Sequence, residues 1–212
     1  MFNDLTDKAH QDFEARHQVR EIALKNTRQL TRRAANAIRA IHRGEREQAE
    51  ESMRAADGIV DVLLEALADF PEFYFSGYTQ DALKEYVEAR LTINFLENEV
   101  LPSPEEMRVE YSTYMRGLAE TIGEMRRRCL DILRKGYSDE AERMLEIMDE
   151  IYALLVTIDY PDAITYGLRR QTDMVRGIIE RTRADLTMSL REQHLQDALK
   201  DFEKRFNQND PR

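Results

Sequence analysis

The 212-residue sequence contains one cysteine, no tryptophan, eight glycines and five prolines. A lone cysteine, Cys129, cannot form an internal disulfide, which is typical of a protein in the reducing cytoplasm. Few glycines and prolines leave few turn signals, whereas the strong helix formers leucine, alanine, glutamate, arginine and methionine are abundant. No segment alternates between apolar and polar residues, so no β-sheet is expected. The composition therefore predicts an all-α protein.

Other signals are missing as well. No apolar run reaches the roughly 18 residues of a membrane span, and the first residues, M-F-N-D-L-T-D-K, do not resemble a signal peptide. There is no glycine-rich phosphate loop and no C-x-x-C motif. The four histidines lie outside the two acidic segments described below, so the Glu-x-x-His pairs of di-iron bundles are absent. These absences argue against a membrane protein and a ferritin-like oxidase, and we expect a cytoplasmic protein.

Apolar residues recur at helical spacing between a few turn signals such as Gly44 and Pro102-Ser103-Pro104. Ser103 and Glu106 form a capping box at a helix start. The pattern predicts six long helices, over residues 4–43, 45–69, 79–101, 104–135, 138–158 and 162–206. No linker or repeat interrupts them, so the sequence predicts a single domain over residues 1–212, an antiparallel bundle of about six to seven helices. The final N-Q-N-D-P-R is expected to fray.

The charge is unevenly distributed. The chain carries a formal net charge of −10, yet nine basic residues and two acidic ones lie between Arg16 and Arg46, a local charge of +7. Five of these arginines follow one another at steps of 4, 7, 4 and 3 and form one basic stripe, namely Arg28, Arg32, Arg39, Arg43 and Arg46. The stripe has two interpretations: a solvated face with intramolecular ion pairs, or a track for phosphates.

Two glutamate pairs stand out. Glu85 and Glu88 occur in E-Y-V-E and share a helix face, and Glu88 falls close to the apolar positions Leu91 and Phe95. A carboxylate on a packed side needs a partner, such as a base, a second acid or a metal ion. Glu120 and Glu124 again share a face of the next long helix.

Gly117 and Gly123 flank the second pair. Because glycine inside a helix costs about 1 kcal/mol, these two predict a close approach of helices. The four carboxylates could form an oxygen-rich cluster suited to Mg²⁺ or Mn²⁺, or they could be solvated helix faces.

The segments E-Y-V-E-A and Y-M-R-G-L-A-E-T-I-G-E-M resemble the translin family, and within it the branch of translin-associated factor X (TRAX). Tyr114, Gly117, Ala119, Gly123 and Glu124 match the pattern of that branch. Its third acid is an aspartate where this chain has Glu120, a departure that lengthens the ligand arm by one methylene. The final helix, from Leu168 through Asp173 to Asp185, also resembles the last helix of the family.

The resemblance implies a helical protomer in a hollow homo-oligomer, with an octamer as the expected form. It also implies a Mg²⁺-dependent endoribonuclease, with Mn²⁺ as an alternative ion, that acts on single-stranded RNA; single-stranded DNA is a further candidate. Glu85, Glu88 and Glu120 would be catalytic, and these three with Glu124 would bind metal. The expected nucleic-acid contacts are Arg16, Arg20, Lys25, Arg28 and Arg32. The alternatives are a translin-like nucleic-acid-binding protein without activity and a helical scaffold with solvated acids.

Overall fold

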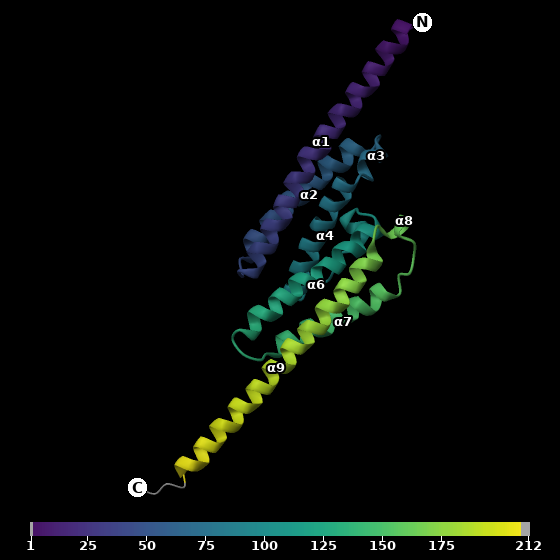
Figure 1. Ribbon diagram of the computed structural model, residues 1–212. Helices are drawn as coiled ribbons and strands as arrows, with labels where there is room; N and C mark the ends of the chain where they lie inside the picture. The colour runs from purple at the N-terminus through teal and green to yellow at the C-terminus, as the bar shows by residue number, and fades with distance from the viewer. Residues whose placement is uncertain (1, 209–212) are drawn as a thin grey trace. The chain divides into compact units, whose positions relative to one another are not determined.

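The computed structural model describes residues 2–208 and contains no strand among them, which confirms the all-α prediction (Figure 1). Six long helices are α1 (Phe2–His42), α2 (Arg46–Leu67), α4 (Gly77–Glu97), α6 (Tyr111–Leu133), α7 (Asp139–Val156) and α9 (Leu168–Gln208). Three single turns are α3 (Pro71–Tyr74), α5 (Pro104–Met107) and α8 (Asp162–Thr165). None of the described helices is long and apolar enough to cross a membrane.

The chain forms two compact units, Met1–Thr121 and Ile122–Arg212. The prediction of a single domain therefore stays a prediction. The expectation that the C-terminal tail frays falls mostly on residues 209–212, which lie outside the described residues.

In the first unit, α1, α2 and α4 pack against one another. The buried side of α1 is built largely from alanine, with Ala23, Ala34, Ala37 and Ala40 almost fully covered. Such small side chains let neighbouring helices approach closely. Gly44, at φ 77°, ends α1 as the sequence predicts, because glycine adopts the left-handed region without steric cost.

In the second unit, the later turns of α6 are followed by α7, α8 and α9, and α7 packs along α9. Leucines, isoleucines and methionines fill this core, and Met125, Met144 and Met148 are fully buried. Cys129 is also buried, and burial raises the pKa of its thiol to about 11. The thiol therefore stays protonated at neutral pH, which fits a structural residue rather than a nucleophile.

Two of the predicted helices are interrupted. The helix expected over 104–135 is divided into α5 and α6, since Arg108 adopts φ 55° and its N–H bonds back to the carbonyls of Glu105 and Pro104. The helix expected from residue 162 stops at Tyr166, with φ 51°, and Gly167, with φ 86°, before α9 begins. The capping box of Ser103 and Glu106 is confirmed, at 3.2 Å from the Glu106 N–H to Ser103 Oγ and 2.7 Å from the Ser103 N–H to Glu106 Oε2.

Gly117 confirms the predicted close approach of helices. A Cβ at this position would lie 2.7 Å from Cβ and Cγ1 of Val87 and 2.9 Å from the backbone oxygen of Lys84. At Gly123, by contrast, an added Cβ would meet no atom of the described residues within 4 Å. The prediction of a close helix approach at Gly123 is therefore wrong.

Gly117→Ala should therefore lower the free energy of unfolding by about 1–3 kcal/mol, because the new methyl group overpacks the contact with α4. Gly123→Ala is the matched control, since it should be neutral or should stabilise the same helix by up to about 1 kcal/mol. Thermal unfolding followed by circular dichroism measures both. Equal melting temperatures for the two variants would contradict the close contact at Gly117.

Candidate nucleic-acid interface and acidic face

The first candidate surface is one side of α4. Asp81, Lys84, Glu85 and Glu88 lie on it, since positions three and four apart share a helix face. Glu85 and Glu88 are both half-buried, as expected for carboxylates next to a packed stripe. We call these four residues the acidic face of α4.

The first turns of α6 pack against this face through Gly117. Three side-chain contacts join the two helices. The hydroxyl of Thr113 donates to Gln80 Oε1 at 2.5 Å, Arg116 Nη2 donates to Asp81 Oδ1 at 2.8 Å, and Lys84 Nζ donates to Glu120 Oε1 at 2.6 Å. The last contact joins Glu120 of α6 to Lys84 on the acidic face.

Lys84 is a functional candidate that sequence reasoning missed. Its side chain is 14% exposed and that of Glu120 is 32% exposed, so the pair is shielded from water. Lys84 directly precedes Glu85 and lies one turn before Glu88. This position next to the two glutamates is the sequence signal that could have identified Lys84 as a candidate. Lys84 places a positive charge beside the Glu120 carboxylate, where the sequence predicted a metal ion.

In the first unit, Glu85, Glu88 and Glu120 do not form a metal-binding group. Within residues 2–208, no three side chains of aspartate, glutamate, histidine or cysteine lie close enough together to hold an ion. Glu120 bonds to Lys84, and Glu124 belongs to the second unit, where Arg127 Nη1 donates to its Oε2 at 3.4 Å. The carboxylate chemistry fits Mg²⁺, but this arrangement does not assemble a three-ligand site.

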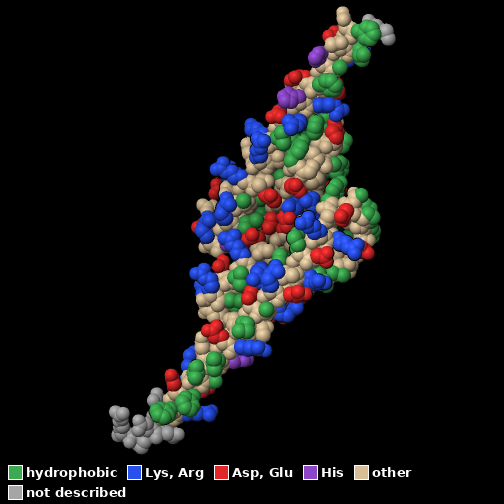
Figure 2. Space-filling model, viewed as in Figure 1, with side chains coloured by type: hydrophobic (Ala, Val, Ile, Leu, Met, Phe, Trp, Pro, Cys, Tyr) green, Lys and Arg blue, Asp and Glu red, His purple; other side chains and the backbone are tan. Residues whose placement is uncertain are grey.

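The second candidate surface is the exposed side of α1. Lys25, Arg28 and Arg32 lie on one face of the helix, and all three are exposed. None of their side chains has a hydrogen bond or ion pair to any residue that the structure describes. We call these three residues the open basic stripe. Figure 2 shows blue lysine and arginine side chains along α1.

The other predicted cations already have partners. Arg16 bonds to Asp12, at 3.0 Å from Nε to Oδ2, and to Glu72, and these contacts raise the pKa of its guanidinium, with the bond to Asp12 as the main cause. Arg20 Nη1 donates to Glu21 Oε1 at 3.0 Å. Further along, Arg43 bonds to Glu45, and Arg46 bonds to Glu97 and Glu99.

A groove continues the basic surface beyond the open basic stripe. It has a volume of about 450 Å³ and lies between the end of α1 and the start of α2. From α1 it is lined by Arg33, Asn36, Arg39 and Arg43. Arginines are among the residues that contact phosphate oxygens in protein–nucleic acid complexes.

The chain was compared with known proteins. No protein-family model matches it. It is 33% identical to an uncharacterized protein of Methanocaldococcus jannaschii over 184 residues, which cover 86% of this chain and 81% of that protein. Among solved structures it is similar to AfC3PO in complex with duplex RNA, with a TM-score of 0.78 and 33% identity over 89% of this chain and 96% of the other.

A second solved structure, apo-NeC3PO, shares the fold with a TM-score of 0.79 at 22% identity, over 87% of this chain and 96% of the other. The C3PO proteins are complexes of the translin and TRAX type. At 33% identity over 89% of this chain and 96% of the other, AfC3PO is similar enough to this chain for the two to belong to one family. The chain belongs to the translin family.

Proposed function

We propose that the protein binds RNA through the open basic stripe of α1. The observation that carries this proposal is that Lys25, Arg28 and Arg32 have no partner among the described residues of a chain with a net charge of −10. Three uncompensated cations on one face of an acidic protein are expected to attract a polyanion. The structure of AfC3PO, a relative at 33% identity, contains duplex RNA, which supports the choice of RNA as partner.

Single-stranded RNA is the proposed substrate, and the proposed reaction is endonucleolytic cleavage that depends on Mg²⁺ or Mn²⁺, as in the TRAX branch. Glu85, Glu88 and Glu120 would hold the ion, with Glu124 as a fourth candidate. When bound, such an ion supplies an activated water and neutralises charge on the phosphoryl group. In support, Glu85 and Glu88 share a half-buried face, and Glu120 reaches that face from α6. Lys84 occupies Oε1 of Glu120, so an ion would share this carboxylate with the lysine or replace it.

The alternative function is RNA binding without cleavage. The ion pair of Lys84 and Glu120 favours this alternative, because it satisfies the Glu120 carboxylate without a metal ion. In both functions the stripe on α1 provides the affinity. The two functions differ in whether the acidic face of α4 reacts with the bound strand.

One experiment tests both functions. The full chain is incubated with a fluorescent single-stranded RNA, and binding and cleavage are measured with Mg²⁺, Mn²⁺ or EDTA. Binding in all three conditions with cleavage in the presence of either ion supports the nuclease. Binding without cleavage under any condition supports the binding-only protein, and failure to bind would contradict both. A duplex of the same sequence tests the preference for single strands, and a single-stranded DNA tests the further candidate.

We also propose a cytoplasmic homo-oligomer, with an octamer as the expected form. No residue of α1 before Ala23 and none of α9 after Leu186 is buried within the described part of the chain. On α9, Leu195, Leu199, Phe202 and Phe206 follow one another at steps of four, three and four, and each is more than half exposed. This spacing is typical of a helix that packs against another helix.

Light scattering of the purified chain should give a mass of about 200 kDa, eight times the 24.9 kDa of the chain. Symmetric closure is the usual outcome for soluble homo-oligomers. Replacing Leu199 and Phe202 by glutamate should reduce this mass, because the charges disfavour burial of the α9 stripe. A monomer mass for the unmodified protein would contradict the proposed assembly.

A further inference from the structure

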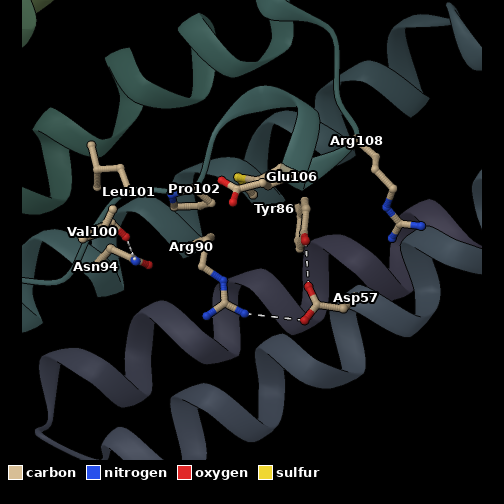
Figure 3. Close-up of a pocket in the computed structure, with 10 residues that line it drawn as sticks. Asp57, Tyr86, Arg90, Asn94, Val100, Leu101, Pro102, Glu106 and Arg108 are labelled. Atoms are coloured by element: carbon tan, nitrogen blue, oxygen red, sulfur yellow. Dashed lines mark hydrogen bonds and ion pairs between the residues drawn. The ribbon is translucent and has the colours of Figure 1, made fainter.

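A pocket of about 480 Å³ lies in the first unit, on the other side of α4 from the acidic face (Figure 3). Tyr86, Arg90 and Asn94 line it from α4, at steps of four residues. At about 100° per residue, this row lies opposite to Glu85 and Glu88 on the helix. The pocket is therefore separate from the face proposed to cut RNA.

The hydrogen-bond donors of the pocket are already used within the protein. The Tyr86 hydroxyl donates to Asp57 Oδ1 at 2.6 Å. Arg90 is bound by two carboxylates, with Nη1 3.1 Å from Glu50 Oε2 and Nη2 3.5 Å from Asp57 Oδ2. Arg108 Nη1 lies 2.5 Å from Asp61 Oδ1. These contacts leave the two guanidinium groups neutralised.

Burial raises the pKa of the Tyr86 hydroxyl, and the hydrogen bond to Asp57 raises it further. The hydroxyl thus remains protonated and continues to donate to Asp57. Tyr86, Arg90 and Arg108 thus each have a carboxylate partner at the floor of the pocket.

The acceptors, in contrast, are not all used. Asn94 is 8% exposed, and its Nδ2 donates to the backbone oxygen of Val100 at 2.6 Å. This bond fixes the orientation of the amide, since the reverse orientation would place two oxygens together. Asn94 Oδ1 is then buried without a hydrogen-bond partner among the described residues. A buried acceptor without a donor is rare in folded proteins, so this atom points to a ligand that donates.

The charge of the pocket favours the same kind of ligand. Four carboxylates, those of Glu50, Asp57, Asp61 and Glu106, surround two guanidiniums, which leaves a local charge of −2. One oxygen of Glu106 accepts the backbone N–H of Ser103 in the capping box, and in Figure 3 its carboxylate lies over the pocket, above Arg90. A positively charged donor would complement both Glu106 and Asn94 Oδ1.

The remaining wall is apolar. Leu101, Pro102 and Met107 line it, and Met107 is 3% exposed. Methylene groups of a ligand can pack against this wall while the charged end reaches the acceptors. We propose that this pocket binds a small alkyl diamine, with one ammonium group at Asn94 Oδ1 and Glu106 and its methylene chain against Leu101, Pro102 and Met107.

Isothermal titration of the full chain with 1,4-diaminobutane, in the absence of RNA, tests this proposal. Saturable binding is expected for the diamine. No binding is expected for 1,4-butanediol, which has the same chain without the ammonium groups. Equal binding of the two compounds, or no saturable binding of the diamine, would overturn the proposal. Binding of cytidine in place of the diamine would instead identify a nucleobase pocket and would also overturn it.

Glu106→Gln is the informative variant, because glutamine keeps the capping box and removes the charge. It should weaken diamine binding by about fivefold, as expected for the loss of one partly exposed ion pair. Glu105→Gln is the matched control, since Glu105 lies next to Glu106 in α5, accepts from the Tyr111 hydroxyl and does not line the pocket. The control should keep the affinity of the unmodified chain. An equal loss in both variants would indicate general attraction to an acidic protein and would overturn the assignment.

Discussion

Glu88→Gln should abolish the cleavage of single-stranded RNA in Mg²⁺ while the affinity for RNA stays within about twofold. Glu88 is half-buried on the acidic face of α4, next to the fully buried Leu91. Glutamine has the same size but no charge, so it removes a metal ligand without removing a phosphate contact. We expect a loss of at least about a hundredfold in rate, since a bound ion contributes several kcal/mol of charge stabilisation in the transition state and about 1.4 kcal/mol is tenfold.

Cleavage and binding are measured on the same fluorescent RNA, by gel assay and by fluorescence anisotropy. Glu97→Gln is the control variant, because Glu97 is on the same helix and its carboxylate is bound to Arg46 at 3.0 Å. It makes the same change in charge and should cleave normally. Wild-type cleavage by Glu88→Gln would contradict the assignment of the acidic face.

Glu120 and Glu124 are separated in the same assay. Glu120→Ala should lose activity as severely as Glu88→Gln, whereas Glu120→Asp should be milder and partly rescued by Mn²⁺. Glu120→Ala also leaves Lys84, which is 14% exposed, without this partner, so melting temperatures must accompany the rates. A folded Glu120→Ala protein with full activity would overturn the role of Glu120 and favour Glu124.

The double variant Arg28→Ala/Arg32→Ala should weaken RNA binding roughly ten- to hundredfold for all sequences. Both guanidiniums lack side-chain partners among the described residues, and a hydrogen bond that replaces one to water contributes about 0.5–1.5 kcal/mol net. The slope of log K against log salt should fall by about 1.4, or about 0.7 for each phosphate contact with a single strand.

The matched control is Arg16→Ala/Arg20→Ala, which removes the same charge from the same helix. These two arginines are bound within the chain, Arg16 to Asp12 and Glu72 and Arg20 to Glu21. Their loss should change the salt slope less than the loss of Arg28 and Arg32. Equal slopes for the two double variants would show that intramolecular pairing does not decide which cations contact RNA.

The sequence by itself determined the helices and several of their ends. Leucine, alanine and glutamate at helical spacing, Gly44 after α1, and the Ser103–Glu106 capping box are local signals, since each acts within four residues. The same periodicity placed Glu85 and Glu88 on one face of α4 and Arg28 and Arg32 on one face of α1. The break at Arg108 was missed because an arginine in the left-handed region has no sequence signal comparable to glycine.

The tertiary structure alone decided which charged groups are satisfied. Arg16 meets Glu72 from 56 residues away, Lys84 meets Glu120 from 36, and Tyr86 meets Asp57 from 29. These pairs decide which cations remain open for RNA, which charge neutralises Glu120, and how the pocket beside Asn94 is lined. They depend on where one helix crosses another, as Gly117 allows for α4 and α6. Helical periodicity fixes the face on which a side chain lies, but it carries no information about the element that packs against that face.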